Sequence, residues 1–255
     1  MNRIDSLFKN KPSDVLTIYF TAGYPNLDDT ESIILGLAKS GVDLIEIGMP
    51  YSDPLADGPV IQASSKEALK NGMNLDLLFD QLEDIRSKTQ VPLVLMGYYN
   101  QVIQYGLEPF CKKANQVGVD GLILPDLPLD EYKKLCAPLF KQYELTCTFL
   151  VTPSSTDKRI REIDTASSGF LYAVSSHSIT GGDSANNLSD YGCRLAALNL
   201  KNPVQVGFGI HDAKSFQAAT AIANGGIIGS AFIKALSKEE VLENKIYSFI
   251  EGIRV

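Results

Sequence analysis

The sequence contains few of the residues from which metal sites and disulfide frameworks are built. It has only two histidines, His177 and His211, and its four cysteines show no Cys-x-x-Cys spacing. Zinc sites need several such ligands at short spacings, so we expect no metal site. Cysteines without such spacing fit a reducing compartment, where they serve as small core residues.

Long apolar runs and clusters of basic residues are also missing. Apolar stretches such as 93–96 and 122–124 are far shorter than the ~20 residues of a membrane span. The first residues, MNRIDSLFKNK, are polar and charged, unlike a secretory signal. The 30 acidic residues outnumber the 23 basic ones, and the net charge of −7 argues against nucleic-acid binding. We therefore expect a cytoplasmic protein that binds neither membranes nor nucleic acids.

Short apolar runs alternate with amphipathic segments along all 255 residues, an order that predicts a parallel α/β sheet. Several runs are continuously apolar, as in sheets covered on both faces. The predicted strands are 16–20, 44–48, 92–96, 121–124, 146–151, 169–174, 204–207 and 226–229. The predicted helices are 28–39, 61–70 with 75–88, 107–116, 129–142, 156–166, 187–198, 212–223 and 238–250.

We expect these elements to form a TIM (β/α)8 barrel, a single domain over residues 1–255. A faint internal repeat, Ala38–Gly48 and Asn115–Pro125, supports closure of the sheet. An extra N-terminal helix with Ile4, Leu7 and Phe8 on one face would close the bottom of the barrel. The alternative, an open doubly wound sheet, predicts a glycine-rich fingerprint after the first strand, and the sequence there does not match it.

One predicted strand contains an acidic residue. Glu46 lies within 44–48, and two-residue alternation puts its side chain on the same face as Leu44 and Gly48. Burial of a carboxylate is costly and raises its pKa toward values useful for proton transfer. Glu46 is therefore a candidate catalytic acid or base, the alternative being a structural carboxylate at the barrel rim.

The loop that follows this strand is rich in turn-forming residues. Residues 49–59 contain three prolines, Asp53 and Asp57, and no basic residue. Functional groups of such barrels gather on the loops after the carboxyl ends of the strands. The composition fits either a rigid catalytic loop or a simple chain reversal.

Residues 44–62 (LIEIGMPYSDPLADGPVIQ) closely resemble the signature of the tryptophan synthase alpha subunit family. The similarity covers essentially the whole chain and continues through 20–25 (FTAGYP), 96–100 (MGYYN), 118–128 (GVDGLILPDLP), 207–210 (GFGI) and 229–230 (GS). The resemblance implies a carbon–carbon lyase that cleaves indole-3-glycerol phosphate to indole and glyceraldehyde 3-phosphate in tryptophan biosynthesis, with Glu46 and Asp57 as the catalytic pair.

The same resemblance implies a partner. The loop from Pro50 to Asp57, with Asp53 at its centre, would face a beta subunit in an alpha2beta2 heterotetramer. Indole would pass to that subunit, which would hold pyridoxal phosphate, and this chain would bind no cofactor.

The available residues agree with acid/base chemistry. None of the 17 lysines falls in a predicted strand, and two histidines cannot build a metal cluster, which argues against the usual aldolase chemistries. Protonation of indole C3 makes the ring its own electron sink, so two carboxylates in different surroundings suffice. Glu46 would take the glycerol hydroxyl proton and could also serve the protonation of C3. Asp57 would accept the indole N–H and stabilise the indoleninium. The group that protonates C3 is left open.

Backbone amides of three glycine-bearing loops are the candidates for phosphate binding, because only Lys234 among the basic residues lies near a strand end. Aromatic residues near the strand ends are candidates for substrate contact, or else core residues. The predicted phosphate contacts are Gly181, Gly209, Gly229 and Ser230. Tyr19, Tyr98 and Phe20 could line the indole pocket, and the resemblance implies Tyr172, Phe208 and Thr180 as further substrate contacts.

One stretch departs from the family pattern. Residues 175–181 read SSHSITG, where the family commonly has Ser-Arg-x-Gly-Val-Thr-Gly. Thr180 and Gly181 match, so closure over Asp57 is expected, while coupling to a partner is left open. We interpret His177 as a solvent-facing residue.

Three other functions would each show a distinguishing feature. A triosephosphate isomerase needs a glutamate after the sixth strand, where this chain has Val174 and Ser175. A free-standing indole-producing lyase would differ only in loop ordering. An interaction subunit with feeble catalysis of its own would differ in the turnover of the isolated chain.

Overall fold

The computed structural model describes residues 2–174, 184–207 and 209–254. Its strands form one sheet in which every pair is parallel, in the order β5-β4-β3-β2-β1-β9-β8-β7-β6. The strands are β1 (Val15–Thr21), β2 (Leu44–Gly48), β3 (Leu93–Met96), β4 (Gly121–Ile123), β5 (Thr146–Thr148), β6 (Leu150–Val151), β7 (Leu171–Val174), β8 (Val204–Gly207) and β9 (Gly225–Ile228).

The two ends of this order meet, so the sheet closes into a barrel. Only Phe149 separates β5 from β6. The N–H of Ser168 donates to the carbonyl of Cys147 at 2.9 Å, and that of Tyr172 donates to the carbonyl of Phe149 at 3.0 Å. The predicted strand 146–151 is thus divided in two, and the (β/α)8 barrel predicted from the sequence is confirmed.

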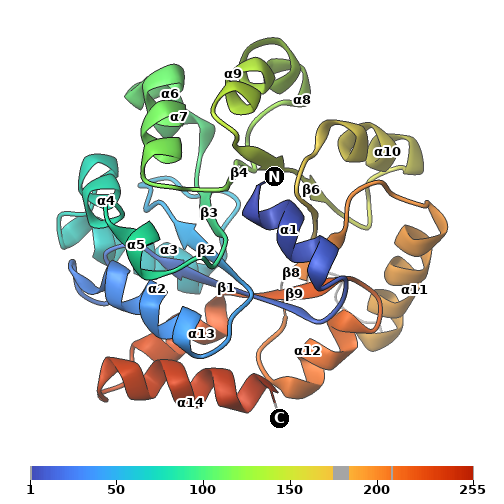
Figure 1. The fold of residues 1–255 in the computed structure, drawn as a ribbon. Coiled ribbons are helices and arrows are strands. Elements are labelled where there is room, and N and C mark those ends of the chain that lie inside the picture. Colours follow the sequence, from blue (N-terminus) through green and yellow to red (C-terminus); the bar gives the residue numbers. More distant parts are fainter. Residues whose placement is uncertain (1, 175–183, 208, 255) are drawn as a thin grey trace.

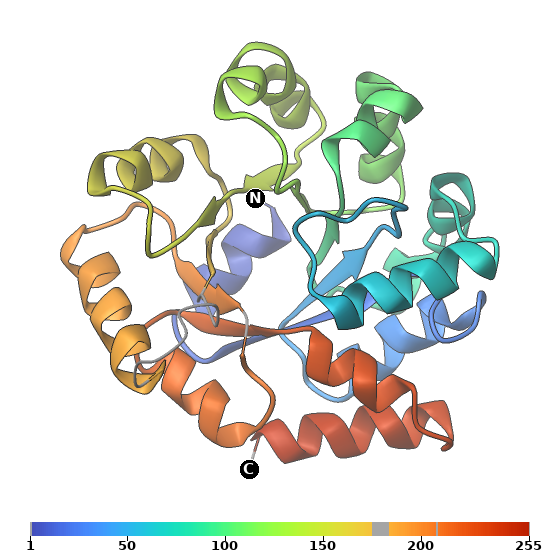
Figure 2. The ribbon, with the colours of Figure 1, turned by 180° about the vertical axis from the view of Figure 1, so that it is seen from behind.

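Helices surround the barrel, as Figure 1 shows. They cover the outer faces of the strands, which explains why the strands are apolar on both sides. Figure 2 gives the opposite view, with α1 behind the strands. The helices are α1 (Arg3–Asn10), α2 (Asp29–Lys39), α3 (Pro59–Lys70), α4 (Leu75–Gln81), α5 (Ile85–Lys88), α6 (Tyr99–Tyr105), α7 (Leu107–Gln116), α8 (Leu129–Glu131), the π-helix η1 (Tyr132–Cys136), α9 (Ala137–Gln142), α10 (Asp157–Ala166), α11 (Ser184–Ala197), α12 (Ala213–Thr220), α13 (Ser230–Leu236) and α14 (Leu242–Arg254).

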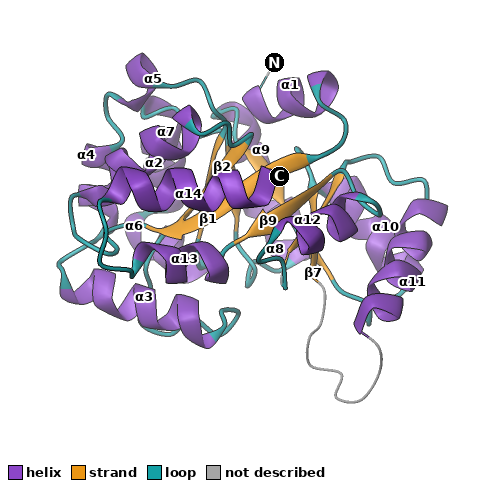
Figure 3. Cartoon of the chain, turned by 90° about the horizontal axis from the view of Figure 1, so that it is seen from below, coloured by secondary structure: helices purple, strands orange, loops and turns teal. Residues whose placement is uncertain are grey.

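The extra N-terminal helix closes one end of the barrel, as predicted. Ile4 and Phe8 of α1 are buried in an inner core, where the rings of Phe8 and Phe170 lie 5.9 Å apart. The other members of this inner core are Val15, Leu44, Val94, Ile123, Tyr172 and Ile227. Figure 3 shows the barrel from the side, with α1 at one end and α3 at the other.

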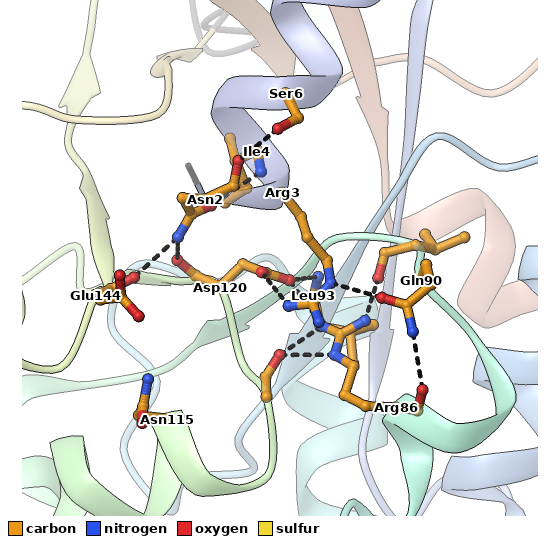
Figure 4. Close-up of polar contacts among 12 residues, drawn as sticks. Asn2, Arg3, Ile4, Ser6, Arg86, Gln90, Leu93, Asn115, Asp120 and Glu144 are labelled. Atoms are coloured by element: carbon orange, nitrogen blue, oxygen red, sulfur yellow. Dashed lines mark hydrogen bonds and ion pairs between the residues drawn. The ribbon is translucent and has the colours of Figure 1, made fainter.

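A polar network centred on Asp120 fastens α1 at this end (Figure 4). The buried Asp120 carboxylate forms ion pairs with Arg3 at 3.0 Å and with Arg86 at 2.7 Å. Asn2 caps α1 by accepting the N–H of Ile4, and its amide donates to the carbonyls of Asp120 and Glu144 at 2.8 and 2.9 Å. These contacts lie at the amino ends of the strands, away from the loops that follow the carboxyl ends.

Within the described residues, no helix combines the length and apolar character that crossing a membrane requires.

Candidate active site

Glu46 lies inside the barrel on β2. It is paired in register with Tyr19 of β1 and Val94 of β3, and only 1% of its surface is exposed. Neither of its carboxylate oxygens has a hydrogen-bond partner among the described residues. Burial, with a smaller contribution from the charge of Asp57, raises the pKa of Glu46 to about 8. A buried carboxyl group without partners is available to a ligand, and it can change protonation near neutral pH.

Asp57 lies directly before α3. Gly58 is the N-cap of this helix and Pro59 its first residue, so the position of Asp57 is fixed by the start of the helix. The hydroxyl of Tyr98 donates to Asp57 Oδ2 at 3.0 Å. Burial raises the pKa of Asp57, whereas the hydrogen bond from Tyr98 lowers it by stabilising the ionised form.

The helix that carries Asp57 is attached to the barrel by a buried pair of hydroxyls. Ser64 of α3 and Thr21 of β1 are hydrogen-bonded at 2.7 Å, and both are buried. The middle of α3 is therefore held beside β1, the neighbour of the strand that bears Glu46.

Two tyrosine rings lie across glycines at the carboxyl ends of the strands. A Cβ atom on Gly48 would overlap Tyr19, and a Cβ atom on Gly207 would overlap Tyr172, so neither position accommodates a side chain. Burial raises the pKa of Tyr172, and the charges of Glu46 and Asp57 raise it further. Glu46, Asp57 and Tyr172 therefore interact electrostatically within one buried site.

The structure places the remaining aromatic candidates differently. Tyr98 is buried and contacts Asp57, as a residue beside the substrate would. Phe20 follows Tyr19 on β1, so the alternation of the strand points its side chain to the opposite face, toward the surrounding helices. There it is fully buried in the hydrophobic core between the strands and the helices. The expectation that Phe20 lines the pocket is therefore wrong.

Three of the four predicted phosphate contacts, Gly209, Gly229 and Ser230, lie within the described residues. Gly209 has φ of +80°, a backbone conformation that favours glycine. Gly229 is the N-cap of α13, and Ser230 is the first residue of that helix. A Cβ atom on Gly229 would lie 3.3 Å from the Tyr19 ring, so this loop borders the aromatic side chains of the site.

Four residues considered from the sequence lie outside the described residues. Thr180 and Gly181 were predicted contacts of the substrate and the phosphate, and Phe208 was a predicted substrate contact. His177 lies in the same segment as Thr180 and Gly181.

In the loop between β2 and α3, the middle is exposed and the two ends are hydrogen-bonded to the segment after β3. Asp53 is exposed, and Leu55 retains 94% of its surface. The carbonyl of Pro50 accepts a hydrogen bond from Gln101 at 3.0 Å. Sequence reasoning did not single out Tyr51 or Asn100, although Asn100 donates to the Tyr51 hydroxyl at 2.9 Å.

The comparisons with known proteins agree with one another. A family model described as tryptophan synthase alpha chain matches residues 6–252. The tryptophan synthase alpha chain of Flavobacterium johnsoniae is 54% identical over 256 residues and is covered completely, as is this chain. That of Christiangramia forsetii is 52% identical, with 100% of this chain and 99% of the relative covered.

Solved structures show the same similarity. Tryptophan synthase subunit alpha from Legionella pneumophila superposes with a TM-score of 0.90 at 31% identity, covering 100% of this chain and 97% of the other. A chain of tryptophan synthase from M. tuberculosis in its aminoacrylate-bound form gives 0.86 at 31% identity, covering 99% and 98%.

Proposed function

Because the chain belongs to the tryptophan synthase alpha chain family, whose members are lyases that catalyse the alpha reaction of tryptophan biosynthesis, we propose that Glu46 and Asp57 carry out this reaction here. The substrate is indole-3-glycerol phosphate, and the products are indole and glyceraldehyde 3-phosphate. The partner is a tryptophan synthase beta subunit, in an alpha2beta2 heterotetramer.

The reaction needs two proton transfers and one bond cleavage. Protonated Glu46 donates its proton to indole C3 and gives an indoleninium ion, whose ring N–H is held by the Asp57 carboxylate. The ionised Glu46 that results then removes the proton of the glycerol hydroxyl attached to the carbon beside the ring, which returns Glu46 to its protonated form. The C–O bond becomes a carbonyl, the carbon–carbon bond breaks, and its electron pair restores the indole.

The single observation that carries this proposal is the state of Glu46. A structural carboxylate would be hydrogen-bonded, but both Glu46 oxygens lack partners among the described residues. Its pKa of about 8 allows both protonation states near neutral pH. Nearby Asp57 receives a hydrogen bond from Tyr98 that favours its ionised form, so the two carboxyl groups are suited to different tasks.

Membership of the same family also supports assignments for the phosphate site, the indole pocket and the cofactor. The backbone of Gly209, Gly229 and Ser230 binds the phosphate, together with Gly181. Tyr19, Tyr98 and Tyr172 line the indole pocket, with Thr180 and Phe208. Pyridoxal phosphate belongs to the beta subunit and this chain binds no cofactor. The protein is a single domain over residues 1–255 and acts in the cytoplasm.

Replacing Glu46 tests the catalytic assignment. Glu46→Gln keeps the shape of the side chain and removes its basicity, so we expect kcat for indole-3-glycerol phosphate cleavage to fall by roughly a hundredfold or more, about 3 kcal/mol in the barrier. Glu251→Gln, on the exposed side of α14, is the matched control and should retain wild-type kcat. Near-normal cleavage by Glu46→Gln would contradict the mechanism.

A further inference from the structure

The loop that ends in Asp57 is hydrogen-bonded near both of its ends to the segment after β3. Gln101 of α6 donates to the carbonyl of Pro50 at 3.0 Å, near the start of the loop. The hydroxyl of Tyr98 accepts the N–H of Ala56 at 2.9 Å and donates to Asp57 at 3.0 Å, at its end. These bonds secure the two ends of the loop but do not contact the residues between them.

A further contact secures the loop between those ends. The ring of Tyr51 stacks on the ring of Tyr98, with centroids 5.0 Å apart and planes inclined by 26°. The hydroxyl of Tyr51 accepts a hydrogen bond from the Asn100 amide at 2.9 Å. Tyr51 is thus held at its ring and at its hydroxyl, and stacked aromatic pairs contribute beyond the area that they bury.

The segment that holds Tyr51 is itself rigidly placed. Tyr98 is the N-cap of α6, and its N–H donates to the side chain of Gln101 at 3.0 Å. The next N–H, of Tyr99, donates to Asp126 at 2.8 Å. The loop therefore rests on a capped helix start that is fixed to the barrel.

We infer that Tyr51 and Asn100 are positioning residues for the alpha reaction, forming a clamp that holds residues 50–57 on the start of α6 so that Asp57 faces the indole. Among the described residues, neither is hydrogen-bonded to Asp57, whose side chain accepts from Tyr98. Tyr51 acts through Tyr98, whose ring it covers and whose hydroxyl holds the carboxylate. This inference rests on the proposed role of Asp57.

The clamp leaves the middle of the loop free. Asp53 and Leu55 are exposed, and the bonds to α6 and its N-cap are made by Tyr51 before them and by the backbone of Ala56 after them. Asp57 is thus oriented by contacts within the chain, and the exposed middle stays available to a partner subunit. The two functions of the loop are therefore carried by different residues.

Steady-state kinetics of the full chain test the effect on catalysis. Tyr51→Phe removes the hydroxyl and keeps the stacking, and Asn100→Ala removes the donor, so each should lower kcat by roughly threefold or more, the range of one hydrogen bond. Because both remove the same bond, the double variant should be no slower than the slower single variant. Tyr143→Phe, which removes a hydroxyl bonded to Glu108 elsewhere, should leave kcat unchanged. Wild-type kcat in Tyr51→Phe and Asn100→Ala would overturn the inference, as would simply additive losses.

Fluorescence anisotropy tests the clamp without reference to activity. The chain has no tryptophan, so Leu55→Trp provides a single reporter at an exposed position in the middle of the loop. Adding Tyr51→Ala or Asn100→Ala should lower the anisotropy of this residue, whereas adding Tyr143→Phe should not. Unchanged anisotropy in the two clamp variants would overturn the inference.

The two assays also separate this inference from the proposed function. If Asp57→Asn cleaved the substrate normally, the proposed function would fail, while the anisotropy would still report on the clamp. If Asp57→Asn were inactive and the clamp variants lost anisotropy but kept wild-type kcat, the clamp would not position Asp57, and the inference would be overturned with the proposed function intact.

Discussion

Glu46 is placed at a cost to the stability of the fold. Its pKa is about 8 in the folded chain, above its ordinary value near 4.5. Between these two pH values the folded state binds the proton more tightly than the unfolded state. The free energy of unfolding is therefore highest, as far as Glu46 is concerned, below pH ~4.5, where the group is protonated in both states. This stability is lost as the pH rises through ~8, because ionised Glu46 is buried in the folded chain.

This linkage predicts how Glu46→Gln affects thermal stability. The variant lacks the ionisation, so its Tm relative to wild type should be higher at pH 8.5 than at pH 5. Thermal unfolding followed by circular dichroism at both pH values measures the difference. Glu251→Gln should shift Tm equally at the two pH values. A pH-independent difference for Glu46→Gln would mean that the folded-state pKa is not raised.

At this scale, the sequence predicts positions inside strands better than contacts between loops. Strand alternation puts Glu46 on the same face as Leu44, which the structure places in the inner core. The same rule excludes Phe20 from the pocket once Tyr19, the register partner of Glu46, faces inward. The bonds of Tyr51 and Asn100 were not predictable, because they depend on how one loop folds back onto the next strand end.

The helices and strands were predictable where their apolar patterns are long. Residues 146–151 read as one continuous strand in the sequence. The break at Phe149, which divides them into β5 and β6, was therefore not predictable. Helix α6 was missed because it has seven residues, of which only Tyr99 and Val102 are buried. Its importance lies in its N-cap, Tyr98, which a search for amphipathic periodicity does not detect.

The loop before α13 gives a prediction about phosphate recognition. Gly229 leaves little space beside Tyr19, so Gly229→Val should bring bulk into the place proposed for the phosphate and raise the KM for indole-3-glycerol phosphate at least tenfold. Steady-state kinetics measures KM, and far-UV circular dichroism checks that the fold is retained. Gly252→Val is the control, since a Cβ atom there has no neighbour within 4 Å. Equal cleavage of indole-3-glycerol with and without its phosphate by the wild type would contradict this site.

The whole molecule gives a prediction about its partner. The exposed Asp53 lies in the middle of the loop proposed to face the beta subunit. Docking of the beta subunit should order this exposed middle, which the clamp does not hold. The isolated chain should therefore be slow, and saturation with a cognate beta subunit should raise its rate at least tenfold, about 1.4 kcal/mol of coupling. Asp53→Ala should reduce this activation more than it reduces the basal rate. Asp5→Ala, exposed on α1 at the other end of the barrel, should affect neither.

Co-sedimentation shows whether the complex has formed at the concentrations used. Equal rates with and without the beta subunit under those conditions would mean that the chain is a free-standing lyase.

The contacts of Asn2 have a consequence for the order of events during synthesis. Its amide bonds to carbonyls 118 and 142 residues further along the chain. At roughly 5–20 residues per second, the ribosome needs about 7–30 s to add the more distant of them. During that interval Asn2 and α1 lack the residues that they contact in the folded barrel. Helix α1 is therefore made well before the segments that secure it, which exposes Ile4 and Phe8 of the nascent chain to chaperones.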